Sequence, residues 1–171
     1  MKYLIAGVSG SGKSTVRRIL EKRGYRCIDI DKEPGLSNWY HKKTGAVGTY
    51  VPGIGSAWIE QHHWLWDEKK MQQLLAVDPS RPVFVCGITS DILDRFNLFS
   101  KVFLLQISPE MVRTRLTERP QDEFGKGEDE IAYTLSWQKE WEEQMLVQGA
   151  VPIDATQSPE SVVESILMRI K

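Results

Sequence analysis

Residues 7–14 contain the residue types and spacing of a phosphate-binding loop. They run Gly-Val-Ser-Gly-Ser-Gly-Lys-Ser and satisfy G-x-x-x-x-G-K-[ST], the P-loop or Walker A motif. A β-rich apolar run at 3–6 precedes the motif and a helical pattern at 13–22 follows it, which is the context the motif requires. A flexible Gly-Ser turn that matches by chance is the alternative, but the flanking strand and helix favour a nucleotide-phosphate site.

The chemistry of this loop comes from its backbone and from two side chains. Glycines let backbone N–H groups turn inward without Cβ clashes, so that these groups and the helix N-terminus surround phosphate oxygens. Lys13 is expected to bridge β- and γ-phosphates as a catalytic residue, and the Ser14 hydroxyl is expected to bind Mg²⁺. The predicted nucleotide-binding residues of the loop are Gly7, Ser9, Gly10, Ser11, Gly12, Lys13, Ser14 and Thr15.

Two carboxylates follow the second predicted strand, residues 26–30. Asp29 and Asp31 are two residues apart and share one face of a strand, at the carboxyl end where parallel sheets bind ligands. One of them suits Mg²⁺ through water, and the other suits an attacking hydroxyl, which it would orient or deprotonate. The alternative is that both only begin and cap the following loop.

Two arginines and a later loop complete the candidate nucleotide site. Arg115 and Arg119 are four residues apart on a predicted helix, so they share a face and can close over phosphates. The alternative is a surface pair bridging to nearby glutamates. Asp154, Ala155 and Thr156 follow the last predicted strand and could border a base, or they form a plain turn into the final helix.

Composition bounds the class of protein without naming an activity. The chain has 171 residues, a net charge of -1 and two cysteines, which fits one domain and excludes a disulfide scaffold. The balance of charge also excludes an acidic disordered chain and a uniformly basic nucleic-acid coat. Residues 1–50 carry a net of +6 and residues 109–148 a net of -5, so the first third would attract an anionic ligand.

The order of the predicted elements indicates an α/β fold. Short apolar runs at 3–6, 26–30, 83–86, 102–107 and 150–153 predict strands. Helical patterns lie at 13–22, 58–75, 92–96, 109–119, 129–146 and 159–170, and serine-proline pairs cap the fourth and the sixth. This alternation predicts a parallel sheet covered on both faces within a single domain over 1–171.

Two segments interrupt the alternation. Residues 32–57 are rich in Gly, Pro and aromatics and too long for a structureless connection, so they are expected to be functional or mobile. With the following helix they form the predicted acceptor-binding region, 32–75, and the break at 119–127 is the predicted lid. His62 and His63 would point about 100° apart on that helix, which does not suit zinc. Trp64 and Trp66 are interpreted as packing residues there.

The P-loop, the D-x-D at 29–31, the R-L-x-x-R at 115–119 and the I-D-A-T at 153–156 together resemble the small P-loop kinases. That family includes nucleoside monophosphate kinases and kinases of shikimate and gluconate. The resemblance implies a three-layer α/β/α fold, a five-stranded parallel sheet of order 2-3-1-4-5, ATP and Mg²⁺ as cofactors, and a mobile lid.

The resemblance also implies roles for individual residues. Arg115 would stack on adenine, Arg119 would reach the phosphates, and 154–156 would line the adenine pocket. Asp29 would serve Mg²⁺ and Asp31 the acceptor hydroxyl, although which carboxylate takes which role stays open.

The acceptor is the least constrained part of this interpretation. Only Gly87 matches the Gly-Gly-Gly turn of shikimate kinases, and the Asp-Gly-Phe-Pro-Arg segment of adenylate kinases is absent. Trp39 and Tyr50 would stack on a ring and Arg95 would supply charge, or the aromatics pack a small helical subdomain. A nucleoside monophosphate or related phosphorylated metabolite is expected first, a neutral hydroxylated metabolite second, and a nucleotide-binding switch is the rival from another class.

Partners and location follow from what the sequence lacks. No apolar stretch approaches the roughly 20 residues of a bilayer span, and no signal-peptide pattern is present, so a cytoplasmic location is expected. A small-molecule acceptor is the expected partner, and a nucleic acid is disfavoured because there is no broad basic stripe. Monomer and dimer are equally compatible with the sequence.

Overall fold

The computed structural model describes residues 1–76, 78, 80–119, 124–125 and 127–170. The strands are β1 (Lys2–Ala6), β2 (Arg26–Asp29), β3 (Ser37–His41), β4 (Val47–Gly48), β5 (His62–Trp66), β6 (Val83–Cys86), β7 (Lys101–Gln106) and β8 (Val151–Asp154). The helices are α1 (Lys13–Lys22), α2 (Ser56–Glu60), α3 (Glu68–Ala76), the 3₁₀ helix η1 (Ile92–Leu98), α4 (Pro109–Thr117), α5 (Glu128–Val147) and α6 (Pro159–Met168). Among the described helices, none combines the length and apolar character that a membrane span needs.

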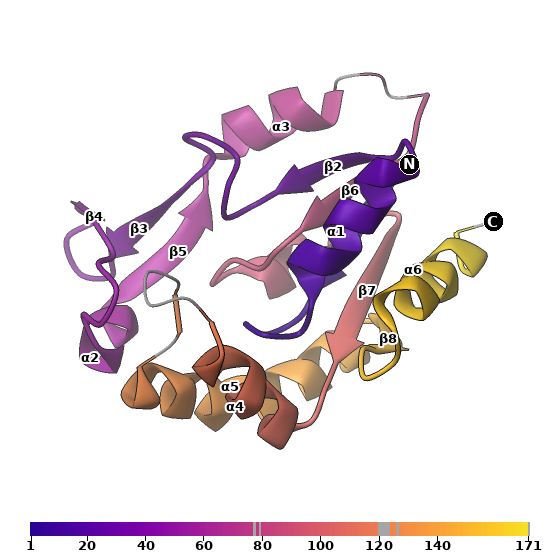
Figure 1. The fold of residues 1–171 in the computed structure, drawn as a ribbon. Helices are drawn as coiled ribbons and strands as arrows, with labels where there is room; N and C mark the ends of the chain where they lie inside the picture. Colours follow the sequence, from indigo (N-terminus) through magenta and orange to yellow (C-terminus); the bar gives the residue numbers. More distant parts are fainter. Residues whose placement is uncertain (77, 79, 120–123, 126, 171) are drawn as a thin grey trace.

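The large sheet confirms the predicted fold class. It has five strands in the order β2-β6-β1-β7-β8, and each neighbouring pair is parallel. Numbered among themselves, these strands have the expected order 2-3-1-4-5. Figure 1 shows α1 lying over this sheet and the long α5 on its other side, with α4 near the carboxyl ends of the strands.

A period of two along the strands divides the apolar core into two halves. Tyr3 and Ile5 of β1 face α1 and α6, where they pack with Phe84 and Phe103. The alternate residues of β1 face the opposite side, together with buried side chains of α3 and η1 and with Met145 of α5. Both faces of the sheet are therefore apolar, as a parallel sheet between helical layers requires.

The helix predicted over 58–75 is wrong. The structure has a short helix, α2, then strand β5, and only then helix α3. Asp67 separates the last two, because its side chain accepts the Lys70 N–H at 2.7 Å and its carbonyl accepts that of Met71. The aromatic segment before Asp67 has β propensity and pairs with β3, so tertiary pairing outweighs the local helical spacing.

The segment 32–57 holds two strands of a second sheet and is not a helical subdomain. The order in this small sheet is β4-β3-β5, and both pairs are antiparallel. Trp64 and Trp66 consequently lie on a strand, and His62 and His63 point to opposite faces of it rather than 100° apart. Figure 1 shows the small sheet with α2 beside the large one, at the left of the view.

The predicted lid lies partly outside the described residues. Of 119–127, the structure describes only Arg119, Phe124, Gly125 and Gly127.

The two predicted serine caps are confirmed, since Ser108 accepts from Met111 N–H and Ser158 from Ser161 N–H, each at 3.2 Å. Helix α4 ends at Thr117, so Arg119 lies just beyond it.

Candidate functional site

The P-loop lies between β1 and α1, as the motif predicts. Gly10 and Gly12 have positive φ angles of +85° and +101°, which glycine adopts without strain. Gly12 is the N-cap of α1, yet no side chain caps this helix and its first turn holds no acidic residue. Its amides therefore point from an uncapped, positively polarised helix end, which suits a polyphosphate.

Lys13 lies folded against this loop. Its Nζ donates to the carbonyl oxygens of Gly7 at 2.6 Å and Val8 at 3.0 Å. Burial lowers the pKa of Lys13 from 10.5 to about 8, the nearby Asp31 opposes that shift, and Arg119 adds to it. The amine is thus held at the phosphate loop, with a carboxylate and a guanidinium close enough to affect its charge.

The two carboxylates of the D-x-D have different surroundings. Asp29 is paired through Oδ2 with Arg17 Nε at 3.1 Å, and its Oδ1 accepts the Asp31 N–H. Asp31 instead faces the cavity, where Oδ1 accepts the Trp64 indole N–H at 3.1 Å. Desolvation by the surrounding protein raises the pKa of the Asp31 carboxyl, and the positive charge of Lys13 opposes the rise. Asp31 is therefore the carboxylate that interacts more strongly with Lys13.

The oxygen donors near the loop fit a magnesium ion. Ser14 is exposed at the start of α1, and carboxylate and hydroxyl oxygens are the protein ligands that Mg²⁺ accepts alongside water and phosphate. Both oxygens of Asp29 already have partners, so contact through water suits it better than direct ligation. Among the described residues there is no His, Cys, Asp and Glu cluster of the kind that holds a metal by protein ligands alone.

The two predicted lid arginines reach the P-loop from the other side. Arg115 donates to Gly10 O at 3.1 Å and to Ala155 O at 3.3 Å, so it bridges the phosphate loop and the loop after β8. Arg119 donates to Phe124 O at 2.9 Å and lies within electrostatic range of Lys13 and Asp31. The structure therefore brings both arginines to the predicted phosphate site.

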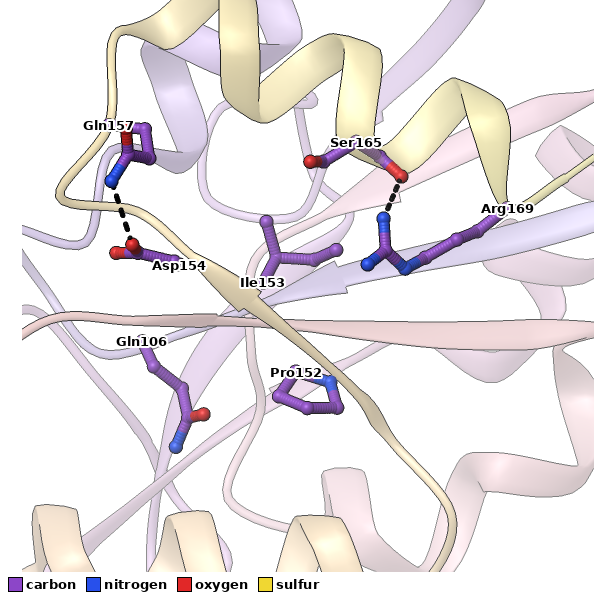
Figure 2. Close-up of a pocket in the computed structure, with 7 residues that line it drawn as sticks. All are labelled: Gln106, Pro152, Ile153, Asp154, Gln157, Ser165 and Arg169. Carbon is purple, nitrogen blue, oxygen red and sulfur yellow. Dashed lines mark hydrogen bonds between the residues drawn. The ribbon is translucent and has the colours of Figure 1, made fainter.

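The end of β8 and the loop that follows it line two different cavities. Ala155 lines the P-loop cavity, whereas Asp154 lines a smaller one of about 500 Å³ beside α6. The carboxylate of Asp154 accepts hydrogen bonds from Thr156 and Gln157, which supports the turn-forming alternative for this residue. Figure 2 shows the pair Asp154 and Gln157 in that smaller cavity, and across it Arg169, whose guanidinium donates to Ser165 O.

A cavity of about 1380 Å³ joins these groups. Ser9 to Ser14 form one wall, and Asp31 and Ile88 to Ser90 lie at the carboxyl ends of β2 and β6. The small sheet and α5 supply the remaining walls, including Trp64 and Trp137. The cavity therefore has one part lined by the P-loop and another rich in aromatic side chains.

The aromatic part is built around five rings, here named the aromatic cluster: Trp39, Tyr50, Trp58, Trp64 and Phe124. Trp39 lies 5.3 Å from Trp64 and 6.1 Å from Phe124 between ring centroids, and Phe124 lies 5.1 Å from Tyr50. All members except Trp58 line the cavity. The predicted acceptor residues Trp39 and Tyr50 therefore line the cavity, and both rings also pack against Phe124.

A buried carboxylate connects this cluster to α5. Glu130 is 1% exposed and accepts the Tyr50 hydroxyl through both oxygens, at 3.1 and 3.0 Å. It also accepts the Gly125 N–H at 3.0 Å. Burial and Glu130 together raise the pKa of Tyr50 to about 12, so the phenol is the donor throughout the physiological range.

The variant Tyr50→Phe is expected to lower the free energy of unfolding by about 1–3 kcal/mol, because it removes a donor from a buried carboxylate. Urea unfolding monitored by circular dichroism measures this change. Tyr40→Phe is the matched control, since Tyr40 has no hydroxyl hydrogen bond among the described residues. Equal losses in both variants would contradict a special role for the Tyr50–Glu130 contact.

Gly87 and Arg95, the other predicted acceptor residues, do not line the described cavity. Arg95 pairs with Asp91 and Glu68 and its guanidinium lies 4.7 Å from the centre of the Trp66 ring. Gly87 follows β6 with φ at +137°, and a Cβ there would lie 2.7 Å from Ile30 Cβ. Gly87 thus sets the close approach of two strand ends, one of which carries Asp31.

The variant Gly87→Ala is expected to destabilise the fold by about 1–3 kcal/mol, because the added methyl group meets Ile30 in a conformation that already disfavours side chains. Thermal unfolding gives the comparison. Gly149→Ala is the control, since it has φ at +98° but nothing within 4 Å of the new Cβ. A loss no larger than the control's would rule out the close contact as the cause.

Several residues at the cavity were not among the predicted site residues. The spacing over 58–75 predicts a helix for Trp64, although the alternation of His62, Trp64 and Trp66 is a strand signal. Phe124 is an apolar ring in an otherwise polar predicted lid, which is an unusual placement that could have drawn attention to it. Ser90, which lines the cavity, and Glu130, which binds Tyr50 from α5, carry no local sequence signal.

Comparison with known families is consistent with this geometry. Residues 4–136 match the family described as "AAA domain", which is more than half of the chain, so the chain belongs to that family. Over 58 residues it is 40% identical to a "Nucleotide-binding protein" of Agathobacter rectalis. That match covers 30% of this chain and 20% of the relative, so the chain corresponds to only about a fifth of the relative's length.

Solved structures of small P-loop kinases have the same fold. Deoxyadenosine kinase from M. mycoides with bound dATP superposes with a TM-score of 0.60 at 18% identity, covering 99% of each chain. Shikimate kinase from Acinetobacter baumannii in complex with shikimate gives 0.61 at 20% identity, covering 99% of this chain and 92% of that one. The expected resemblance to small P-loop kinases is confirmed at the level of the fold.

Proposed function

We propose that this chain is an ATP- and Mg²⁺-dependent phosphotransferase that moves the γ-phosphoryl group of ATP to a small-molecule acceptor. The observation that carries the proposal is the position of Asp31. Its carboxylate faces the same cavity as the P-loop lysine, and the aromatic residues Trp39, Tyr50 and Trp64 line that cavity as well. A protein that only hydrolysed or sensed ATP would have no need for an aromatic region beside its phosphate loop.

The reaction follows from these positions. An acceptor oxygen attacks the γ-phosphorus, and the bond to the bridging oxygen of ADP breaks. Where that oxygen belongs to a hydroxyl group, its proton passes to the Asp31 carboxylate; where it belongs to a phosphate group, no proton has to be removed and Asp31 orients the acceptor. Lys13 and the P-loop amides bind the phosphates, and Arg119 faces the charge of the transferring group. Bound Mg²⁺ would neutralise phosphate charge, with Ser14 and, through water, Asp29 as the residues that suit it.

Arg115 would keep the nucleotide in place. It bridges Gly10 and Ala155, so it borders both the phosphate loop and the expected adenine pocket. Lid closure over the predicted segment 119–127 would exclude water, so that transfer to the acceptor prevails over hydrolysis.

For the acceptor, a nucleoside monophosphate or a related phosphorylated metabolite is the first class. The aromatic cluster offers ring faces at the cavity, and Lys42 and Arg119 supply positive charge there. Ring faces and positive charges that line one cavity suit an acceptor with a flat ring and an anionic group.

A neutral hydroxylated metabolite is the second candidate. The observation that favours it is the pairing of Arg95, which was expected to meet an anionic acceptor but instead contacts Asp91 and Glu68 outside the cavity lining. With that cation engaged elsewhere, the aromatic part of the cavity carries less positive charge than the sequence indicated.

A screen of nucleosides, nucleotides and sugar acids with ATP and Mg²⁺ tests the proposal by the rate of ADP release. We expect low basal hydrolysis and a marked rise with one acceptor. The class of that acceptor decides between the two candidates. Hydrolysis that no compound stimulates would instead favour a nucleotide-binding switch and contradict the proposal.

A further inference from the structure

One hydrogen bond connects the small sheet directly to Asp31. The Trp64 indole N–H donates to Asp31 Oδ1 at 3.1 Å, across 33 residues of sequence. It is the only hydrogen bond on the Asp31 side chain within the described part of the chain. An indole N–H is a donor in every protonation state of the protein, so this contact can restrain one carboxylate oxygen without depending on titration of the indole.

The backbone around Asp31 is already fixed by other contacts. Ile30 N–H donates to Cys86 O at 2.9 Å, and Asp31 N–H donates to Asp29 Oδ1 at 3.1 Å. Neither contact determines the rotation of the Asp31 side chain about its χ1 bond. The indole of Trp64 therefore supplies the missing restraint, leaving Oδ2 as the oxygen without a hydrogen-bond partner among the described residues.

Trp64 is itself held on two sides. Its backbone N–H donates to Ser90 Oγ at 2.9 Å and its carbonyl accepts the Ser90 N–H at 2.8 Å, which attaches β5 to the loop after β6. On the small sheet it pairs with Trp39, whose ring lies 5.3 Å away. A donor held by two parts of the fold has little freedom to move relative to Asp31.

We infer that Trp64 is a positioning residue, which orients the Asp31 carboxylate toward the attacking oxygen of the acceptor and is itself held in place by Ser90. The inference rests on the proposed function and deepens it. It assigns to the small sheet a part in the transfer step, in addition to binding the acceptor. A carboxylate misplaced by an ångström can cost about a hundredfold in rate, so such a restraint is worth a measurable effect.

A double-mutant cycle tests this inference with the full chain. Trp64→Phe keeps an aromatic ring but loses the N–H, and we expect kcat for the acceptor found in the screen to fall about tenfold, with the KM for ATP unchanged. In the Asp31→Asn background the same substitution should change kcat less than about twofold, because the group it positions has been removed. A purely structural role would lower kcat equally in both backgrounds and would overturn the inference.

Two further variants distinguish a loss of positioning from a loss of folding. Ser90→Ala removes the acceptor of the Trp64 backbone N–H and should lower kcat about threefold, again only when Asp31 is present. Trp66→Phe is the matched control, since its indole N–H donates to Glu68 at 3.2 Å and not to Asp31, and it should leave kcat unchanged. Failure of wild-type protein to phosphorylate any acceptor would instead refute the proposed function, an outcome visible before any variant is compared.

Discussion

Replacement of Lys13 by methionine is expected to lower acceptor-stimulated turnover by about 10²–10³-fold. The methionine side chain has a similar length and keeps the packing against the loop, but it removes the only amine that contacts Gly7 O and Val8 O in the described structure. The γ-phosphate would then lose a charge that acts most strongly in the transition state. The measurement is ADP release at saturating acceptor, with ATP binding followed by calorimetry.

Lys22→Met is the control for this variant. Lys22 lies exposed in the last turn of the same helix, so its loss should change neither binding nor turnover. Full stimulated turnover in the Lys13→Met protein would mean that the P-loop assignment is wrong.

The charge of Lys13 also gives ATP binding a pH dependence. Burial lowers its pKa to about 8 in the nucleotide-free protein, so the amine loses its proton as the pH rises through that value. Because a protonated amine binds polyphosphate, the affinity for ATP is expected to decline above about pH 8, by up to tenfold per pH unit. In Lys13→Met this decline should be absent. A dependence of equal steepness in both proteins would assign it to another group.

Replacement of Asp31 by asparagine is the second large expected effect, with kcat falling by about 10²–10⁴-fold. Asparagine is nearly isosteric and its carbonyl can still accept the Trp64 N–H, so the cavity keeps its shape. With an acceptor that reacts through a hydroxyl, the variant loses the group that takes its proton; an acceptor that reacts through a phosphate oxygen loses only its orientation and should show a smaller fall in kcat. ATP affinity should change little, and the loss should appear in kcat rather than in the KM for the acceptor.

Comparison with Asp29→Asn separates the two carboxylates. Asp29 pairs with Arg17, so its substitution is expected to affect stability and Mg²⁺ dependence, with a smaller loss of kcat at saturating Mg²⁺. Asp94→Asn, in an exposed position on η1, controls for loss of a negative charge alone. A larger loss of kcat in Asp29→Asn than in Asp31→Asn would reverse the roles proposed for them.

The large sheet was predictable because its information is local. Each strand is a short apolar run that ends at a polar or glycine residue, and the alternation with helices determines a parallel sheet. The small sheet lacked such information. The alternation of His62, Trp64 and Trp66 is a strand signal, but it covers only five residues between helical patterns, and the partners in the pairs β3–β5 and β3–β4 follow only from the fold.

The candidate site, too, was predictable from the sequence only in part. The P-loop is contiguous in sequence, so its residue types already specify phosphate binding, and the structure places Arg115 and Arg119 beside it as expected. The contacts Trp64–Asp31 and Tyr50–Glu130 span 33 and 80 residues. Such contacts arise only when segments far apart in the sequence fold together, and no periodicity in a single sequence indicates them.

The destination of the γ-phosphoryl group tests the central claim most directly. Protein incubated with γ-labelled ATP, Mg²⁺ and the acceptor found in the screen is separated into organic phosphates and inorganic phosphate. The proposed function predicts that the label moves to the organic acceptor, with one ADP formed per label transferred, and that Lys13→Met abolishes the transfer. Label recovered only as inorganic phosphate, whichever acceptor is supplied, would contradict the assignment as a phosphotransferase.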